Sequence, residues 1–320
     1  MTTTAQPSAA DAADARDLSA GLVGAAIAVC AWSTGTVLAK GIEMGGLAIG
    51  TYRFWMFSLA LIGWMYLRKT PFTLHSIRAT AFGGIALGAD IALFFSAVKE
   101  TSIVNATIIG SLQPILVGVI AARFFGEKIR GRDALWSILA LAGVVVIVTT
   151  STADDVSNIK GDLLAMGAMF SWSAYFIASK QSKGKVTPTE FTAGTALWTA
   201  MIVTPLGFAF GQDMSWPSWK NWALLAAMAI GSGIIGHVLM NWSLVRIPLW
   251  VGSTFTLLIP VFSAIIAWIF LDEAIALRQA LAMAVVIGSL AMIVRGQSTA
   301  ARASAAHREV LDPDESISPT

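Results

Sequence analysis

The segment SLQPILVGVIAARFFGEKIRGR, residues 111–132, has a sparse copy at residues 257–278, LLIPVFSAIIAWIFLDEAIALR. A proline, a glutamate and an arginine have the same spacing in both segments: Pro114, Glu127 and Arg132, then Pro260, Glu273 and Arg278. Each match lies 146 residues further along the chain, so the alignment needs no gap. An internal repeat of this kind is typical of many secondary transporters, whose substrate site lies where the two copies meet.

The composition excludes an ordinary soluble protein, since 56% of the 320 residues are hydrophobic and only 12% are charged. Apolar stretches of about 20 residues, the length that a helix needs to cross the hydrocarbon core, recur along the chain. We predict an all-α integral membrane protein with ten transmembrane helices, at residues 18–39, 47–67, 77–98, 102–122, 133–150, 161–180, 190–210, 221–244, 249–271 and 276–294.

Lysine and arginine residues predict the orientation, because cytoplasmic loops of membrane proteins are enriched in them. With the N-terminus inside, 15 of the 21 basic residues fall on the cytoplasmic side, five fall outside and Arg53 lies within a span. We therefore expect a multi-pass membrane protein with both termini in the cytoplasm.

The duplication divides the chain into two copies of five spans, residues 18–150 and residues 161–294. Trp32 and Lys40 in the first span of one copy match Trp172 and Lys180 in the other, 140 residues later. An odd number of spans makes the second copy enter the membrane from the opposite side, so we expect two inverted repeats.

The two ends of the chain are polar and are expected to be disordered cytoplasmic tails. Residues 1–17 combine Ala, Thr and Ser with three aspartates and lack the basic region of a signal peptide. Residues 296–320 have a similar composition, and we assign 295–320 to the second tail.

This arrangement resembles the EamA type of the drug/metabolite transporter superfamily. The resemblance covers about residues 18–294 and rests on the two proline-containing helices, each followed by a Gly-Glu or Asp-Glu pair, at Gly126-Glu127 and Asp272-Glu273. Arg53 also matches an arginine that members often carry in the second helix. The resemblance implies a metabolite transporter, and the family handles amino acids, other metabolites, nucleotide precursors and cationic drugs. Together with the short tails and the absence of a transit peptide, it also implies the cytoplasmic (inner) membrane of a bacterium. We expect the two copies to work by alternating access around a central site.

Two ionisable residues are predicted at similar depth in the membrane, Arg53 in the second span and Asp90 in the third. Charged groups in the hydrocarbon are unfavourable and usually face the bundle interior. Arg53 is a candidate for binding a substrate carboxylate, with Asp90 as a protonatable partner. The alternative is a structural ion pair that fixes two helices.

His237 and Asn241 lie one turn apart on the eighth span and share a helix face. A histidine there could take up a proton and couple proton movement to transport, or it could be a packed residue that bonds a carbonyl. Ser232 and His237 also allow an intramembrane hydrolase, with serine as nucleophile and histidine as base. Glycine and serine at this spacing more often allow close packing of membrane helices, so we do not expect an enzyme.

Trp32 and Trp172 lie on the corresponding first helices of the two copies and are candidates for the substrate cavity, with Tyr175 as a further candidate beside Trp172. Lipid-facing packing is the alternative for these aromatic residues. Pro114 and Pro260 interrupt corresponding helices and are candidate hinges, although membrane helices also tolerate proline. Gln113 adds a neutral polar group beside Pro114, and Glu127 and Glu273 fall at span ends, where we expect capping or gating contacts.

The predicted function is export of a small zwitterionic or neutral metabolite, such as a hydrophobic or aromatic amino acid. The protein is expected to be a monomer or a homodimer. A multiply anionic substrate is disfavoured because Arg53 is the one basic residue predicted inside the membrane. The runner-up is an organic-cation exporter with aromatic faces and Asp90. The expected partners are the substrate and the lipid bilayer, with proton coupling left open. No metal or cofactor motif occurs, and nothing indicates nucleic-acid binding.

Overall fold

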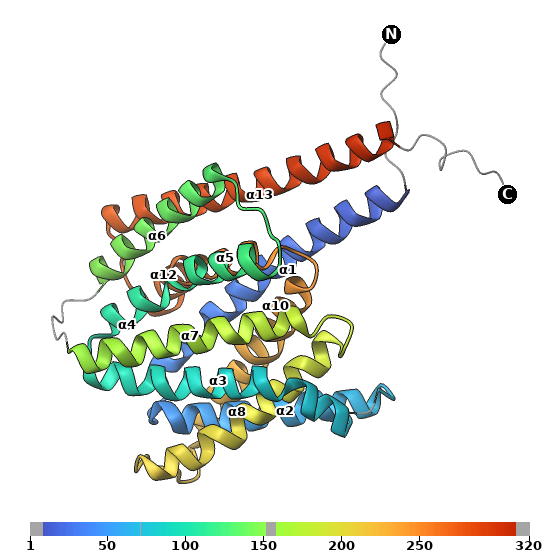
Figure 1. The fold of residues 1–320 in the computed structure, drawn as a ribbon. Coiled ribbons are helices and arrows are strands. Elements are labelled where there is room, and N and C mark those ends of the chain that lie inside the picture. The colour runs from blue at the N-terminus through green and yellow to red at the C-terminus, as the bar shows by residue number, and fades with distance from the viewer. Residues whose placement is uncertain (1–8, 71, 152–157, 312–320) are drawn as a thin grey trace.

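The chain folds as a bundle of long helices (Figure 1). The computed structural model describes residues 9–70, 72–151 and 158–311, and no strand occurs within these ranges. The helices are α1 (Ala9–Lys40), α2 (Gly46–Leu67), α3 (Leu74–Glu100), α4 (Ile103–Gly110), α5 (Gln113–Phe124), α6 (Gly131–Ser151), α7 (Ile159–Gln181), α8 (Pro188–Ala209), α9 (Trp219–Met228), η1 (Ala229–Gly236), α10 (His237–Leu244), α11 (Leu249–Thr254), η2 (Phe255–Leu258), α12 (Ile259–Leu271) and α13 (Leu277–Leu311).

Nine stretches of the described residues are long and apolar enough to cross a membrane. They are α1, α2, α3, α4 with α5, α6, α8, α9 through α10, α11 through α12, and α13. Helix α7 has a similar length of 23 residues but carries Lys160, Asp162 and Lys180 near its ends, which makes it less apolar. The prediction of an all-α membrane protein is confirmed.

Helix α1 begins at Ala9 and α13 continues to Leu311, beyond the expected spans. Parts of both predicted tails, residues 9–17 and 295–311, are therefore helical instead of irregular. Alanine is frequent in both segments and has the highest helix propensity, so a membrane helix can continue into water there. The rest of the predicted tails lies outside the described residues.

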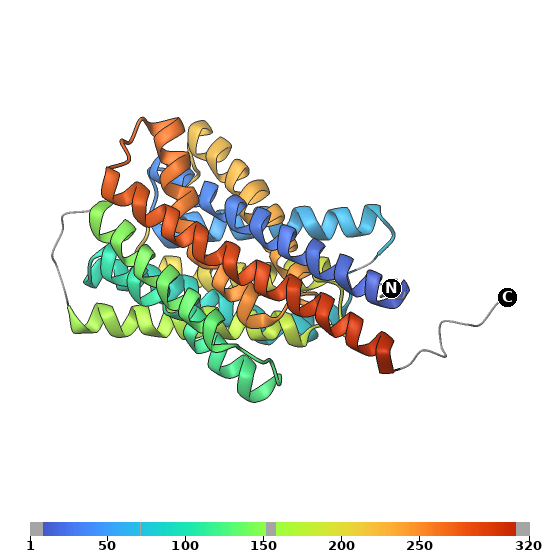
Figure 2. The same ribbon diagram turned by 90° about the horizontal axis from the view of Figure 1, so that it is seen from above.

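The helices pack in pairs that correspond between the two halves of the chain (Figures 1 and 2). Helix α1 packs on α10 and α12, and α7, its counterpart in the second half, packs on α3 and α4. Helices α2 and α8 contact each other, as do α6 and α13. The start of α1 and the end of α13 lie at the same end of the bundle (Figure 1).

The two proline-containing spans are both broken directly before the proline. One span divides into α4 and α5 with Pro114 in the first turn of α5. The other divides into α11, η2 and α12 with Pro260 in the first turn of α12. Proline has no N–H and its ring clashes with the preceding turn, which explains both breaks.

Ion pairs mark the two ends of the bundle. Lys40–Glu273, Lys160–Glu100 and Lys220–Glu43 lie at one end, which we call the Lys40 end. Lys180–Glu127 and Arg246–Asp17 lie at the other, the Lys180 end.

Candidate functional site

A cavity of about 500 Å³ lies between the two halves of the bundle, within the usual range of ligand sites. Its walls come from α1, α2, α3, α4, α7, α9, η1, α10 and the broken span at Pro260, mostly from the helix portions nearer the Lys40 end. Six of the ten predicted site residues line it: Trp32, Arg53, Asp90, Trp172, His237 and Pro260.

Aromatic rings form the deep wall of the cavity. The indole rings of Trp32 and Trp172 lie edge to face with centroids 5.3 Å apart. The ring of His237 lies 5.2 Å from Trp32 and stacks on Phe57 at 5.9 Å. Edge-to-face and offset arrangements are the favourable geometries for such pairs, so this wall is well ordered.

Helix η1 is a π-helix of eight residues, and its glycines give the rings room. A Cβ at Gly236 would lie 2.5 Å from the indole of Trp32, and one at Gly233 would lie 2.8 Å from the ring of Phe57. π-Helical turns are frequent at functional sites, and here the turn leads directly into His237. The glycines and serine of this run, Gly231-Ser-Gly-Ile-Ile-Gly236, indicate close helix packing but do not predict a π-helix.

Gly236→Ala is expected to push Trp32 out of place and to destabilise the protein by about 1–3 kcal/mol, the usual effect of overpacking. The measurement is the midpoint of thermal unfolding in detergent. Gly63→Ala is the matched control, because nothing lies within 4 Å of its Cβ position inside α2. Equal midpoints for the two variants would contradict the close contact.

Arg53 and Asp90 face the same cavity from α2 and α3. Among the described residues no ion pair joins them, and Nε of Arg53 is buried without a hydrogen-bond partner. The guanidinium lies 4.7 Å from the ring centroid of Phe54. The structural ion pair considered above is therefore not formed here, and both groups are available to a ligand.

Tyr175 and Asn241 lie behind His237 and do not line the cavity. The Tyr175 hydroxyl lies 3.0 Å from Nδ1 of His237, and Nδ2 of Asn241 donates to that hydroxyl at 2.8 Å. All three side chains are buried. His237 and Asn241, which were predicted to share a helix face, thus both bond the hydroxyl of Tyr175.

Gln113 and Pro114 are also buried outside the cavity lining. Gln113 Oε1 accepts a hydrogen bond from Thr256, which itself lines the cavity, at 3.3 Å. Pro260 lines the cavity whereas its counterpart Pro114 does not, so the two halves contribute unequally.

Several lining residues were not predicted from the sequence: Thr36, Thr107, Ser111, Phe94 and Phe95. Thr107 and Ser111 are four residues apart on the fourth span, a spacing that puts polar groups on one helix face. That periodicity was the available signal, and it was weak because serine and threonine can bond their own helix.

Ser232 and His237 do not have the geometry of a hydrolase. The Ser232 hydroxyl donates to the carbonyl of Met228 at 3.0 Å, and Nδ1 of His237 is engaged with Tyr175. A nucleophile needs a base within hydrogen-bond reach, and no bond joins these two within the described chain. The described residues also contain no cluster of three or more metal-ligating side chains.

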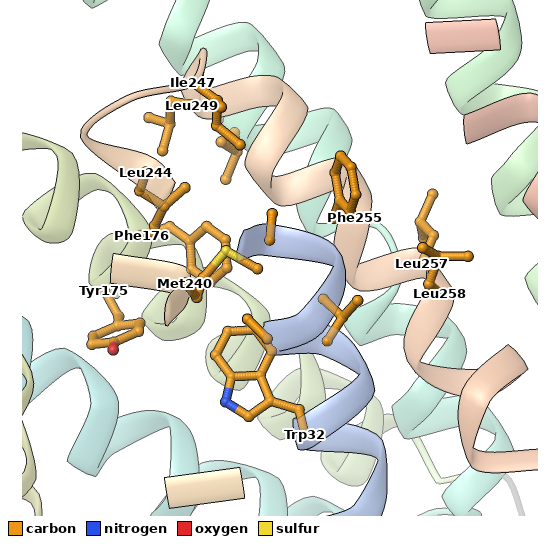
Figure 3. Close-up of a cluster of buried hydrophobic side chains, with 14 of the residues drawn as sticks. Trp32, Tyr175, Phe176, Met240, Leu244, Ile247, Leu249, Phe255, Leu257 and Leu258 are labelled. Carbon is orange, nitrogen blue, oxygen red and sulfur yellow. The ribbon is translucent and has the colours of Figure 1, made fainter. Parts of the chain in front are cut away.

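The cavity is closed toward the Lys180 end by a hydrophobic plug, which we define as Phe176, Met240, Leu244, Ile247 and Leu249. Figure 3 shows these side chains gathered between Trp32 and the loop that carries Ile247. Each is at most 1% exposed. Burying such a side chain contributes roughly 1.5–3 kcal/mol, so opening this end requires other contacts to replace the plug.

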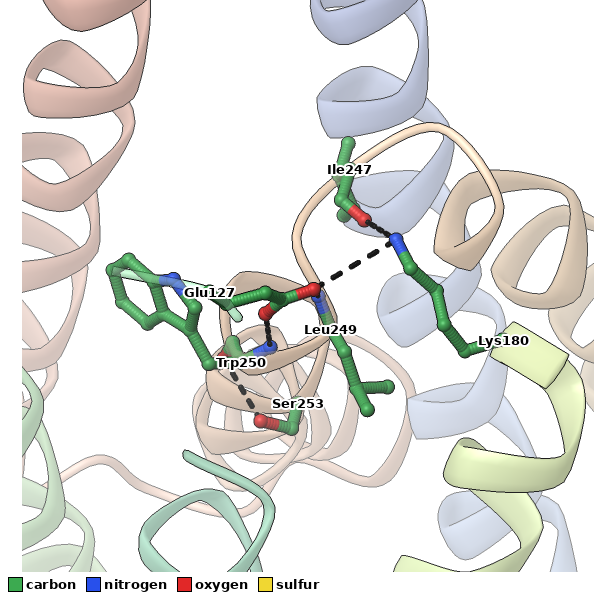
Figure 4. Close-up of polar contacts among 6 residues, drawn as sticks. All are labelled: Glu127, Lys180, Ile247, Leu249, Trp250 and Ser253. Carbon is green, nitrogen blue, oxygen red and sulfur yellow. Dashed lines mark hydrogen bonds and ion pairs between the residues drawn. The ribbon is translucent and has the colours of Figure 1, made fainter. Parts of the chain in front are cut away.

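Glu127 closes the same end with polar contacts (Figure 4). Its carboxylate accepts hydrogen bonds from the backbone amides of Leu249 at 2.7 Å and Trp250 at 3.2 Å, and so caps the start of α11. Lys180 lies 3.9 Å from this carboxylate and donates to the carbonyl of Ile247 at 2.6 Å. The expected capping role of Glu127 is thus observed.

The corresponding pair at the other end is different. Lys40 and Glu273 are 2.6 Å apart, but their side chains are 56% and 50% exposed, against 19% and 12% for Lys180 and Glu127. Within the described residues Glu273 makes no hydrogen bond to the start of α4. There the side-chain hydroxyl of Ser102 accepts a hydrogen bond from the backbone N–H of Asn105 instead. The Lys180 end is sealed, whereas the Lys40 end is held by an exposed ion pair.

Comparison with known proteins agrees with this architecture. The sequence model of the EamA-like transporter family matches residues 19–149 and again residues 159–295. The threonine/homoserine exporter RhtA of Salmonella typhimurium (strain SL1344) is 24% identical over 82% of this chain and 87% of its own. The aromatic amino acid exporter YddG of Ancylobacter novellus is 29% identical over 47% of this chain and 52% of its own.

A protein of known crystal structure has the same fold. It aligns with 88% of this chain and 98% of its own with a TM-score of 0.78, at 22% sequence identity. At this identity the likeness concerns the fold alone.

Proposed function

The chain belongs to the EamA-like transporter family, and we propose that it exports a zwitterionic or neutral metabolite, most simply a hydrophobic or aromatic amino acid. The main observation behind this proposal is that Arg53 and Asp90 line one cavity beside an aromatic wall and are not paired with each other, so both can bind a ligand. A carboxylate fits the guanidinium, an ammonium group fits Asp90, and an apolar side chain fits the rings. The two exporters named above act on amino acids, which supports the same class here.

We infer ten spans in two inverted repeats that move around this cavity by alternating access. The inference is supported by the corresponding helix contacts and by the two spans broken at proline. Pro114 and Pro260 are the proposed hinges of these spans. The helices of the cavity wall come from both halves, as a site at the repeat interface requires.

The Lys180 end is assigned to the cytoplasm of a bacterial inner membrane, with both termini on that side. Most basic residues cluster near this end, in accord with the excess of Lys and Arg in cytoplasmic loops. The plug and the Glu127 cap then close the cytoplasmic side, and the cavity faces outward in this conformation.

Counterflow in proteoliposomes tests the function. Vesicles with purified protein are preloaded with one unlabelled compound from a panel of amino acids, nucleosides and quaternary cations, and the uptake of its labelled form is followed with and without a pH gradient. Exchange of amino acids above that of empty vesicles is expected. Dependence on the pH gradient distinguishes proton exchange from transport driven by the substrate gradient. No exchange of any compound by folded protein would refute the exporter.

An organic-cation exporter is the second candidate, because Asp90 and the aromatic rings could hold a cation without a carboxylate. Asp90→Asn separates the two. For an amino-acid exporter, Arg53 keeps the carboxylate, and the half-saturation concentration is expected to rise about tenfold through the loss of one charged contact. For a cation exporter, binding depends on this single acid, and exchange should disappear. The measurement is counterflow of an amino acid and of a quaternary cation by the same preparation.

A further inference from the structure

We propose that Tyr175 is a positioning residue that fixes the proton of His237 on Nε2, so that this neutral imidazole presents an N–H donor to an acceptor oxygen of the substrate. The proposal deepens the function proposed above and rests on it for the ligand. It concerns a hydrogen-bonded relay of four residues: Thr192, Asn241 and Tyr175 lie behind the cavity wall, and His237 is part of that wall.

The direction of hydrogen-bond donation in this relay is fixed, because the relay begins at a backbone carbonyl, and a carbonyl can only accept a hydrogen bond. The hydroxyl of Thr192 donates to the carbonyl of Pro188 at 2.8 Å. Its oxygen therefore accepts from Asn241, whose Nδ2 lies 2.9 Å away. This orients the amide so that its NH₂ group faces both Thr192 and the Tyr175 hydroxyl.

The same direction of hydrogen-bond donation continues from Asn241 through Tyr175 to His237. Nδ2 of Asn241 donates to the Tyr175 oxygen at 2.8 Å, which leaves the tyrosine proton for Nδ1 of His237 at 3.0 Å. Thr195 lies beside the same hydroxyl, and because its own proton is engaged with the carbonyl of Phe191 at 2.9 Å, its oxygen is the competing acceptor for the tyrosine proton. Within the described residues, however, the acceptor at hydrogen-bond distance and angle is Nδ1 of His237. Nδ1 is thus the acceptor, and a neutral ring carries its proton on Nε2.

Nε2 is the nitrogen that remains for a ligand. His237 lines the cavity, and within the described chain no hydrogen bond to Nε2 occurs. Arg53 lines the same cavity from α2, so two donors face it. Two donors suit a carboxylate, which has two acceptor oxygens.

The relay also argues against His237 as the proton carrier considered from the sequence. A protonated ring has N–H groups at both nitrogens, so Nδ1 would have to donate to Tyr175. The tyrosine proton would then have to turn away toward Thr195. The relay therefore favours the neutral ring.

Nitrogen NMR of the full-length protein, labelled with ¹⁵N only at histidine, measures the position of the proton. The sequence has three histidines, His75, His237 and His307, and the signal missing in His237→Gln identifies the one of interest. We expect a protonated Nε2 and an unprotonated Nδ1 at His237 in the wild type and in Thr195→Val. A proton on Nδ1 would overturn the proposal. Tyr175→Phe should give a mixture of the two forms. The matched control is Tyr66→Phe, which removes the hydroxyl of an exposed tyrosine on α2.

Binding of an amino acid and of the corresponding amine without the carboxylate tests the consequence. Tyr175→Phe should raise the Kd of the amino acid about fivefold, the usual effect of one lost or misdirected hydrogen bond, and leave that of the amine unchanged. Equal changes for both ligands would show a merely structural role and overturn the proposal. If the wild type binds neither compound, the proposed function fails, while the proton position at His237 is still decided by NMR.

Discussion

Arg53→Ala is expected to suppress amino-acid exchange at ordinary substrate concentrations, with Kd raised roughly 12- to 160-fold. Hydrogen bonds to a charged partner contribute about 1.5–3 kcal/mol, and the guanidinium can offer two to one carboxylate. The free Nε of Arg53 and the lack of an ion pair with Asp90 leave the group ready for this role. The measurement is equilibrium binding of a labelled amino acid to purified protein.

Two companion variants make the result specific. Arg53→Lys keeps the positive charge but loses the planar guanidinium that can form two parallel hydrogen bonds to a carboxylate. A Kd between those of the wild type and Arg53→Ala is therefore expected. Arg68→Ala removes an exposed arginine of the same segment, which packs on Trp64 with 5.2 Å to the ring centroid, and should bind as the wild type does. Similar losses for Arg53→Ala and Arg68→Ala would contradict a carboxylate site.

Glu127→Ala is expected to open the Lys180 end. The substitution leaves two amides at the start of α11 without an acceptor and removes the carboxylate beside Lys180. A loss of about 2 kcal/mol, typical of charge-assisted bonds, changes the ratio of closed to open molecules roughly 30-fold. The readout is maleimide labelling of Ser253→Cys, a position with no exposure in the closed state, in a Cys30→Ser background without other cysteines.

Glu273→Ala is the matched control for this experiment. It removes the corresponding glutamate, whose partner Lys40 is exposed, and exposed ion pairs contribute little. Labelling at residue 253 should rise strongly with Glu127→Ala and hardly with Glu273→Ala. If neither variant changes labelling, Glu127 does not hold this end closed.

The sequence predicted the helices well because hydrophobic length and the repeat are local signals. Trp32, Trp172, Arg53, Asp90 and His237 were found because polar or aromatic residues within apolar spans stand out, and all five line one cavity. The repeat added the expectation that the first helices of both halves would face the site.

The relay behind the wall could not be predicted in the same way. Tyr175 and His237 are 62 residues apart, and Asn241 and Thr192 are 49 apart, so their contacts depend on how α7, α8 and α10 pack. The π-helix before His237 depends on tertiary contacts of Trp32 and Phe57 with glycines. Propensity carries no information on either feature.

The unequal closure of the two ends has a consequence for cell physiology. A carrier that is mostly closed to the cytoplasm offers few open sites there, and apparent affinity falls in proportion to that fraction. The concentration for half-maximal export should therefore exceed the intrinsic dissociation constant of the cavity. With the proposed orientation, the protein is expected to export little substrate at low internal concentration and progressively more as the compound accumulates.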